Sequence, residues 1–421
     1  MEIMASSGIA AALLPSRRTA HSRFCIPIEI NEDSICSIIN HSLLANLIKT
    51  TKLIICDEAL MVRKFCIEAS NHSLKDILRC NRTFGGKTVV MGGDLTNVSS
   101  NTKGGRVDIV NSAINSSSLW TKCTLLHLTK NMRLLSHSNI DESLRIKSFS
   151  EWLLKIGEGR IGYDISGMTW IDLPENLIIQ QVIDPIKAIV DATYPYLIHN
   201  IFDSEYISNR AILAPTMKIV KTLNDYVLSH VHREEVEYYN SNSINKTQKE
   251  DTTQHDIYTI EFLNTITYSG IPPHVLTLKV GVLIMLLRNI DQSTGLCNGM
   301  RPRITLLGGH FIKAVALNRT IKDEEVLIHR MDLNPSQSRL PFSMTRRQFS
   351  VMVLFAMTIN KSQGQLMERV GLYLSTPVFS HGQLYVALSR VKSIDGLKIL
   401  VLDAEKKPTN QTINVVYDEI F

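Results

Sequence analysis

A short apolar run that ends in two adjacent acids constrains this sequence more than any other feature. Residues Leu53 to Cys56 are apolar, and Asp57 and Glu58 follow at once. Four apolar residues without alternation are typical of a parallel strand buried on both faces, which delivers the next residues to the ligand-binding edge of an α/β sheet. There an Asp can hold Mg²⁺ and a neighbouring Glu can orient or deprotonate a water. A strand that merely ends in a solvated acid pair fits these residues equally well.

The residues that follow extend this unit into an α/β sheet. Apolar residues at helical spacing from Met61 to Leu78 predict a helix directly after the acids. A second strand is expected from Thr88 to Met91, and it carries Asp94 to the same sheet edge. A third strand, expected from Thr124 to Leu128, leads to Arg133. A lone Arg is usually a solvated surface residue, but beside a nucleotide it can stabilise charge on a phosphoryl group.

The tripeptide Gly86-Lys87-Thr88 imitates the end of a phosphate-binding P-loop, but we do not expect it to cradle ATP. The full pattern needs Gly at position 81, where Asn81 stands. The tripeptide also precedes a strand, whereas a P-loop follows a strand and opens a helix whose amides face the phosphates. No other G-x-x-x-x-G-K-[ST] segment occurs in the 421 residues.

The rest of the chain predicts a connector, a second α/β domain and a β-rich insert. Amphipathic patterns predict helices at 146–156 and 179–192, and a new βα unit begins near Ala211. The polar segment 233–256 predicts a mobile surface excursion. The expected domains are an incomplete first α/β domain at 1–135, a helical connector at 136–205, and a second α/β domain at 206–421 with a β insert around 296–345.

Two further segments carry groups that suit a nucleic-acid backbone. Lys361 to Gln365 follow a buried strand expected from Phe349 to Met357, and their side chains can donate to phosphate oxygens. Near the N-terminus, cationic side chains beside Phe24 could contact phosphates while the ring of Phe24 stacks a base. An exposed turn with Phe24 in the core is the commoner arrangement. Arg390 closes a helix, where it can simply complement the helix dipole.

Composition bounds the class of protein without identifying it. With 44% hydrophobic and 20% charged residues the chain is globular, and its net charge of +5 permits a polyanionic partner. The seven cysteines form no C-x-x-C pair, so we expect reduced thiols and no zinc site. No apolar run has the length and flanks of a membrane span or an export signal. We therefore expect the protein to stay inside the cell, without a membrane partner.

Eight blocks of the sequence carry a resemblance that none carries alone. In chain order, they are Ala5 to Ala10, Thr19 to Ser22, Asp57-Glu58, Phe84 to Thr88 with Gly93-Asp94, Asn131 to Arg133, Leu286 to Asn289 with Gly295 to Gly299, Ala356 to Gln365 and Tyr385 to Arg390. Taken together, these blocks resemble the eukaryotic petite-integration-frequency (PIF) type DNA helicases of superfamily one, most closely the branch found in plants and Helitron transposons. The resemblance implies an α/β fold with two RecA-like P-loop NTPase domains, the first one incomplete, and a small SH3-like β insert.

The resemblance also implies an activity. It implies an ATP-dependent helicase that moves 5′ to 3′ and acts in telomere maintenance, recombination and repair. The implied partners are single-stranded and duplex DNA, with ATP as substrate and Mg²⁺ as cofactor. A monomer located in the nucleus is expected, and the sequence alone does not separate nucleus from organelle.

Site residues carry over from the resemblance position by position. Asp57 and Glu58 match the Mg²⁺-binding and water-activating pair, and Arg133 and Arg390 match two arginine fingers. Asn97 stands where the family has a γ-phosphate-sensing Gln. The remaining implied contacts are Asp94, Gln363 and Gly364 with the nucleotide, and Thr19, His21, Phe24, Lys361 and Ser362 with DNA.

One departure leaves two hypotheses open. The family's G-x-x-G-x-G-K-T loop lies upstream of the block at Ala5 to Ala10, and these 421 residues begin after it. A P-loop makes most contacts to the β- and γ-phosphates, so we expect nucleotide binding to be impaired without it. Either the chain is part of an ATP-dependent helicase whose true start lies upstream of Met1, or it is a truncated remnant that at most binds single-stranded DNA without turnover.

Overall fold

The computed structural model shows two compact units. The first comprises Met1–Thr193, Ile212–Ile219 and Met357–Phe421, and the second comprises Tyr194–Ala211 and Val220–Ala356. The structure describes all residues except 7, 13, 15–17, 98–104, 131, 133–139, 166–167, 181, 245–257, 269, 292–295, 318–323 and 336–341, and the side chains of 9, 12, 97 and 140.

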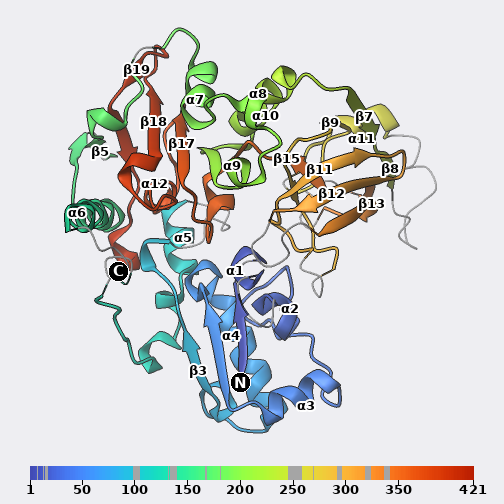
Figure 1. Cartoon of the computed structure of the whole chain (residues 1–421). Coiled ribbons are helices and arrows are strands. Elements are labelled where there is room, and N and C mark those ends of the chain that lie inside the picture. Colours follow the sequence, from blue (N-terminus) through green and yellow to red (C-terminus); the bar gives the residue numbers. More distant parts are fainter. Residues whose placement is uncertain are drawn as a thin grey trace. The chain divides into compact units, whose positions relative to one another are not determined.

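A three-stranded parallel sheet organises the N-terminal part of the first unit. Its strands are β1 (Glu2–Ala5), β2 (Leu53–Asp57) and β3 (Thr88–Met91), with β2 in the middle. Helix α4 (Lys64–Leu78) follows β2 and packs behind the strands in Figure 1. The strand that ends at the acid pair and the helix after it therefore confirm the prediction.

Residues Thr124 to Leu128 form no strand, contrary to the prediction. They have no regular structure, and the side chains of Leu126 and Leu128 are 89% and 102% exposed. A strand needs a neighbour to pair its backbone N–H and C=O groups. Among the described residues β3 is the last strand of its sheet, and no strand pairs with its outer edge. The apolar pattern of this segment thus lacks the partner that would make it a strand.

A second, mostly parallel sheet is built from the later part of the chain. Its strands are β6 (Arg210–Ala214), β16 (Ala356–Thr358), β17 (Arg369–Leu374), β18 (Leu397–Leu402) and β19 (Pro408–Thr409), in the order β16-β6-β17-β18-β19. The strand expected from Phe349 to Met357 is in fact divided, because β15 (Val351–Val353) belongs to another sheet.

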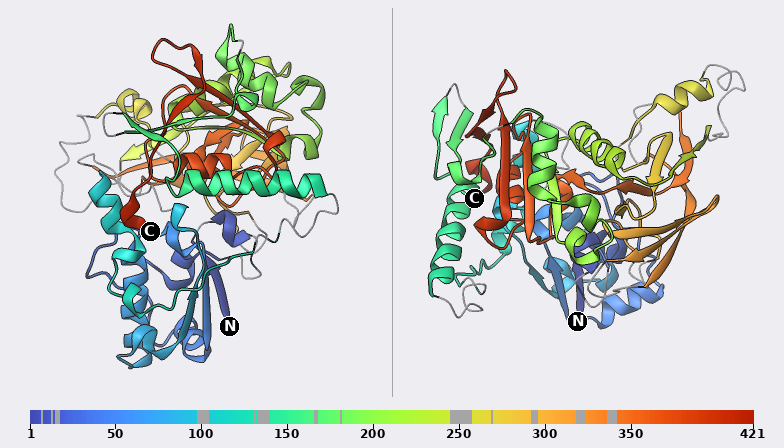
Figure 2. Two further views of the ribbon diagram at one scale, coloured as in Figure 1. Left: turned by 90° about the vertical axis from the view of Figure 1, so that its left-hand side faces the viewer. Right: turned by 45° about the horizontal axis from the view of Figure 1, so that its top comes forward.

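The segment predicted as a helical connector also contains strands. Helix α6 (Ile140–Gly157) runs beside the later helix α12 (Gln383–Leu388), as Figure 2 shows. Then β4 (Tyr163–Ile165) and β5 (Met168–Asp172) form a hairpin that pairs with β20 (Gln411–Asn414). The end of the chain is thereby joined to a segment some 240 residues earlier, as the pairing of Gln411 with Asp172 shows. Short-range patterning could not reveal that pairing.

The second unit holds the β-rich segment. An antiparallel sheet runs in the order β11 (Pro302–Leu307), β12 (Phe311–Ala316), β13 (Glu325–Leu333), β14 (Met344–Phe349) and β8 (Ser241–Ile244). The predicted insert is therefore β-rich, although the sheet extends beyond 296–345, and its SH3-like nature stays a prediction.

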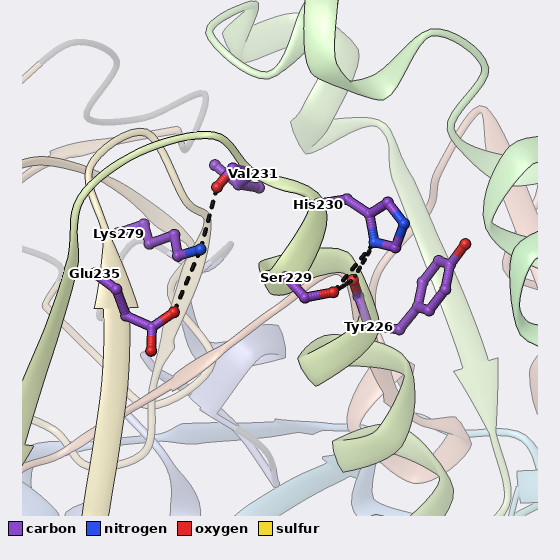
Figure 3. A network of polar contacts seen from close by, with 6 residues as sticks. All are labelled: Tyr226, Ser229, His230, Val231, Glu235 and Lys279. Atoms are coloured by element: carbon purple, nitrogen blue, oxygen red, sulfur yellow. Dashed lines mark hydrogen bonds and ion pairs between the residues drawn. The ribbon is translucent and has the colours of Figure 1, made fainter.

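The polar segment 233–256 is not wholly an excursion, because its first half forms strands. Besides β8, strand β7 (Glu235–Tyr239) pairs with β9 (Val275–Lys279). Lys279 fixes this ladder to the preceding helix α10 (Met217–His230), as Figure 3 shows. Its Nζ donates to the carbonyl of Val231 at 3.2 Å and pairs with Glu235 at 3.3 Å. The residues from 245 onward lie outside the described part of the chain.

The remaining elements are short. None of the helices in the described residues is both long and apolar enough to cross a membrane. The other helices and strands are α1 (Gly8–Ala12), α2 (Ala20–Phe24), α3 (Leu43–Thr50), α5 (Arg106–Ser112), α7 (Pro185–Thr193), α8 (Leu197–Asn200), α9 (Ser204–Ser208), α11 (Ile260–Thr265) and β10 (Ile284–Leu286).

Candidate active site

The acid pair lies where β2 ends, in a tightly held turn. Glu58 has φ +52°, a left-handed conformation that non-glycine residues rarely adopt, and its N–H donates to Asp57 Oδ1 at 3.0 Å. The backbone of Gly92 holds the turn from the β3 side. Its N–H donates to the carbonyl of Cys56 at 2.9 Å, and its carbonyl accepts from Ala59 N–H at 2.8 Å. Strained backbone fixed by its surroundings is common at functional sites.

Asp94 lies beyond the end of β3, as predicted, but its carboxylate is already bonded to protein groups. Oδ1 accepts from the Thr96 N–H at 3.0 Å and from the Thr96 hydroxyl at 2.7 Å. Oδ2 accepts from the Tyr385 hydroxyl at 2.9 Å. Asp94 therefore connects this turn to α12, and direct contact of its carboxylate with a nucleotide stays a prediction.

Arg390 belongs to the same unit as the acid pair and interacts electrostatically with Glu58. Burial and the charge of Asp57 raise the pKa of Glu58, whereas the Arg390 guanidinium opposes them and Asp94 adds to them. Four charged side chains from two sheets thus share one electrostatic environment. A carboxylate with a raised pKa is a stronger base than an exposed Glu, which suits a residue that takes a proton from water.

The guanidinium of Arg390, two residues beyond the end of α12, is held by the last turn of that helix, by Ser389 and by the carbonyl of Gln365. Its Nε donates to the Val386 carbonyl at 2.8 Å, and its Nη2 donates to the Ser389 hydroxyl at 2.7 Å. A longer bond of 3.4 Å joins Nη1 to the Gln365 carbonyl. These contacts fix the direction in which the cation points, and the bond to the Val386 carbonyl also complements the end of α12.

The predicted DNA-contacting block after β16 folds into a short 3₁₀ turn, Ile359–Ser362. Ser362 is fully buried and donates to the Ile359 carbonyl at 2.6 Å, so its predicted contact with DNA is corrected to a structural role. Lys361 and Gln363 are half-buried, and Gly364 has φ +76°. Their predicted contacts with DNA and nucleotide remain predictions.

The predicted DNA block near the N-terminus mainly builds the core. Phe24 is 7% exposed within the apolar cluster under the sheet, so the prediction that it stacks a base is wrong. Thr19 caps α2 by accepting from the Ser22 N–H at 3.2 Å. His21 contacts Cys66, and burial, assisted by Arg63, lowers its pKa. Contacts of Thr19 and His21 with DNA stay predictions.

Two predicted site residues cannot be placed. Arg133 lies outside the described residues, and so does the side chain of Asn97. Gly86-Lys87-Thr88, rejected as a phosphate loop, does precede β3 rather than a helix, and the Lys87 ammonium donates to the Lys49 carbonyl. The predicted place of the tripeptide before a strand is confirmed.

The acid pair suits a metal ion that keeps most of its water ligands. Within the described residues no three His, Cys, Asp or Glu side chains are grouped as a metal cage. Mg²⁺ is usually held by one or two carboxylates with waters and substrate phosphates, rather than by an all-protein cage. Asp57 is exposed at the sheet edge and offers such an oxygen. The donor set therefore fits Mg²⁺ bound together with a nucleotide.

Comparisons with known proteins agree with this geometry. The model of the PIF1-like helicase family matches residues 2–166, and that of the Pif1 DNA helicase 2B domain matches residues 261–307. The "ATP-dependent DNA helicase PIF1" of Danio rerio is 29% identical over 206 residues, which is 45% of this chain and 29% of that protein. The chain thus spans under a third of the length of this curated relative.

Solved structures show the same fold along nearly the whole chain. A structure of two coordinating Pif1 helicases at forked double-stranded DNA has a TM-score of 0.64 at 20% identity, covering 99% of this chain and 89% of that one. The Bacteroides Pif1 helicase in complex with ADP-AlF3 and single-stranded DNA has a TM-score of 0.63 at 19% identity, covering 98% and 89%.

Proposed function

Since the chain belongs to the PIF1-like helicase family, we propose that its acid pair and Arg390 are parts of an ATP-hydrolysing site that drives the unwinding of DNA. The observation that carries the proposal is the electrostatic interaction of Arg390 with Glu58, two residues that belong to one compact unit. Movement 5′ to 3′, and roles in telomere maintenance, recombination and repair, are proposed from the resemblance to the family.

Each residue has a distinct part in the proposed reaction. Asp57 would hold Mg²⁺, which when bound neutralises charge on the phosphates. Glu58 orients the attacking water and accepts its proton, helped by its raised pKa. Arg390 stabilises the negative charge that develops on the transferring phosphoryl group. Lys361 and Gln363 bind phosphate oxygens of the nucleotide or of the DNA backbone.

A single copy of the chain brings the acids and Arg390 together, since all of these residues belong to one unit. That supports a monomeric working form, although the relative solved on forked DNA acts as two coordinating helicases. Single-stranded and duplex DNA are the proposed partners. A nuclear location is proposed from the family resemblance alone.

The proposal is tested by ATP hydrolysis with and without single-stranded DNA. The 421 residues contain no P-loop pattern, and a P-loop makes most contacts to the β- and γ-phosphates. The assay therefore compares the 421-residue chain with the same chain joined behind a strand and a G-x-x-G-x-G-K-T loop. We expect DNA-stimulated hydrolysis at least in the fusion.

Glu58→Gln should then lower kcat by about 10²-fold or more, because the amide cannot accept a proton from water. Glu405→Gln, at an exposed site where the carboxylate pairs with Lys407, is the matched control and should leave kcat unchanged. Equal rates in the two variants would contradict the assignment of Glu58. If neither polypeptide turns over ATP yet both bind single-stranded DNA, the chain is a binding remnant and the proposed activity is wrong.

A further inference from the structure

Tyr385 makes a contact that connects the two sides of the site. Its hydroxyl donates to Asp94 Oδ2 at 2.9 Å, across 291 residues of sequence. The ring lies in a crowded place, because a Cβ on Gly157 at the end of α6 would come within 2.9 Å of the ring and within 3.0 Å of the Thr96 methyl group. Only a residue without a side chain at position 157 allows Tyr385 and Thr96 to meet as they do.

His381 makes a second contact between the same two segments. Its Nδ1 accepts from the Tyr417 N–H at 2.9 Å, so Nε2 must carry the proton that points at the Leu95 carbonyl, 3.3 Å away. The ring is 3% exposed and packs against the rings of Tyr417 and Phe421. A neutral His with both nitrogens bonded thus joins the residue after Asp94 to the residues before α12.

Each end of this pair of contacts is rigidly connected to a catalytic group. On one side, Asp94 lies two residues beyond Gly92, whose backbone holds the turn of Asp57 and Glu58 from both sides. On the other side, Tyr385 lies in α12, and Arg390 is bonded to the carbonyl of Val386 in that same helix. A shift of α12 relative to Asp94 would therefore also shift Arg390 relative to Glu58.

We propose that the Tyr385–Asp94 and His381–Leu95 hydrogen bonds form a latch that sets the position of Arg390 against Glu58. Tyr385 and His381 are then positioning residues, which act on the reaction through Asp94, Leu95 and Arg390. This inference rests on the proposed function and extends it, since the latch keeps the Arg390 guanidinium aligned with Glu58, the proposed base.

Tyr385→Phe tests the latch, because it removes only the hydroxyl and keeps the ring that packs against Gly157. In the polypeptide that hydrolyses ATP, we expect kcat to fall about tenfold with the KM for ATP unchanged, since a misplaced Arg390 weakens transition-state stabilisation rather than binding. Tyr163→Phe is the matched control. It removes a hydroxyl that also faces an Asp carboxylate, Asp172, in the sheet formed by β4, β5 and β20.

A double-mutant cycle separates positioning from general loss of structure. Arg390→Lys should cost much less in the Tyr385→Phe background than in the wild type, because the guanidinium is already misplaced there. Additive effects on kcat would overturn the latch. A loss of kcat in Tyr163→Phe equal to that in Tyr385→Phe would overturn it as well.

Amide hydrogen exchange makes the result independent of turnover. We expect Tyr385→Phe to speed exchange in two separate segments, Gly92 to Thr96 and Gln383 to Arg390, while β17 stays protected. If Glu58→Gln leaves hydrolysis unchanged but Tyr385→Phe speeds exchange in both segments, the proposed function fails and the latch stands. If Glu58→Gln abolishes hydrolysis while Tyr385→Phe changes neither kcat nor exchange, the function stands and the latch is wrong.

Discussion

The two parallel sheets that carry the site differ in how completely they are covered. In the later sheet every residue of β17 except Arg369 is buried, and β18 is buried except for half-exposed Lys398. In the N-terminal sheet β3 has no buried residue, and Val90 is 48% exposed. Parallel strands are normally covered on both faces. Arg390 therefore belongs to the part of the unit whose sheet has buried strands. Asp57 and Glu58 lie at the end of a strand whose sheet, among the described residues, has a partly exposed outer strand, β3.

The turn of Glu58 is held by contacts from inside and from outside its own sheet. Its turn is held by Gly92 and, through Asp94, by Tyr385 on the better-covered side of the unit. Within the described residues β3 pairs with a strand on one side only, so it has fewer backbone bonds to resist local opening. We infer that the latch stabilises the acids as well as aligning Arg390.

The largest expected effect is a difference in the free energy of unfolding between variants that shorten an apolar side chain in β17 and in β3. Leu372→Ala in β17 removes a fully buried side chain and should lower the free energy of unfolding by about 3 kcal/mol. Val90→Ala in β3 should cost about 1 kcal/mol or less, because half of that side chain is already in water. Chemical denaturation of both variants measures the two losses. Equal losses would show that β3 is as well covered as β17.

A smaller contrast is expected in amide hydrogen exchange. The amides of β17 should open at a cost at least about 2 kcal/mol greater than those of β3, whose outer edge is unpaired in the described residues. Exchange followed by mass spectrometry on the unmodified chain checks this. Protection of β3 equal to that of β17 would mean that another strand covers its edge in solution.

The smallest expected effect is a pH dependence at the latch. Burial lowers the pKa of His381 below its usual value of about 6.5, although the Leu95 carbonyl and the charges of Asp94, Asp418 and Glu419 oppose this shift. The unfolded chain therefore takes up a proton at a higher pH than the folded one. The stability from His381 is fully present above about pH 6.5 and is lost as pH falls toward the lowered pKa.

His381→Asn provides the matched variant, since its amide oxygen can accept from the Tyr417 N–H without titrating. At pH 7 it should cost about 1 kcal/mol through the lost bond to Leu95. The decline in stability between pH 6.5 and pH 5 should be shallower than in the wild type. An unchanged pH profile would show that His381 is not the group responsible.

The local sequence pattern was sufficient to predict the acid pair and its strand, but not the role of Arg390. The strand, acid pair and helix from Leu53 to Leu78 were predictable, because periodicity and a strand-ending acid are short-range features. The role of Arg390 came only through family resemblance. Its approach to Glu58 joins residues more than 300 positions apart, and no local spacing encodes that.

The errors have physical causes of the same kind. Thr124 to Leu128 have the apolar composition of a strand, but composition does not supply a pairing partner. Phe24 lies beside cations in the sequence, yet burying its ring in the core stabilises the fold more than leaving it exposed on the surface. Tyr385 was missed as a positioning residue, since its partner Asp94 is reached only in the folded unit.

The most direct test of the central claim is a cycle of Glu58→Gln and Arg390→Lys, measured as DNA-stimulated kcat in the polypeptide that hydrolyses ATP. Arg160→Lys, at an exposed ion pair with Glu158, is the control for the cation and should leave kcat unchanged. If Glu58 and Arg390 serve one phosphoryl transfer, each single change should lower kcat by about 10²-fold or more, and the double variant should be far less impaired than the product of the two. Independent, multiplying effects, or a rate in Arg390→Lys equal to that in Arg160→Lys, would contradict a shared site.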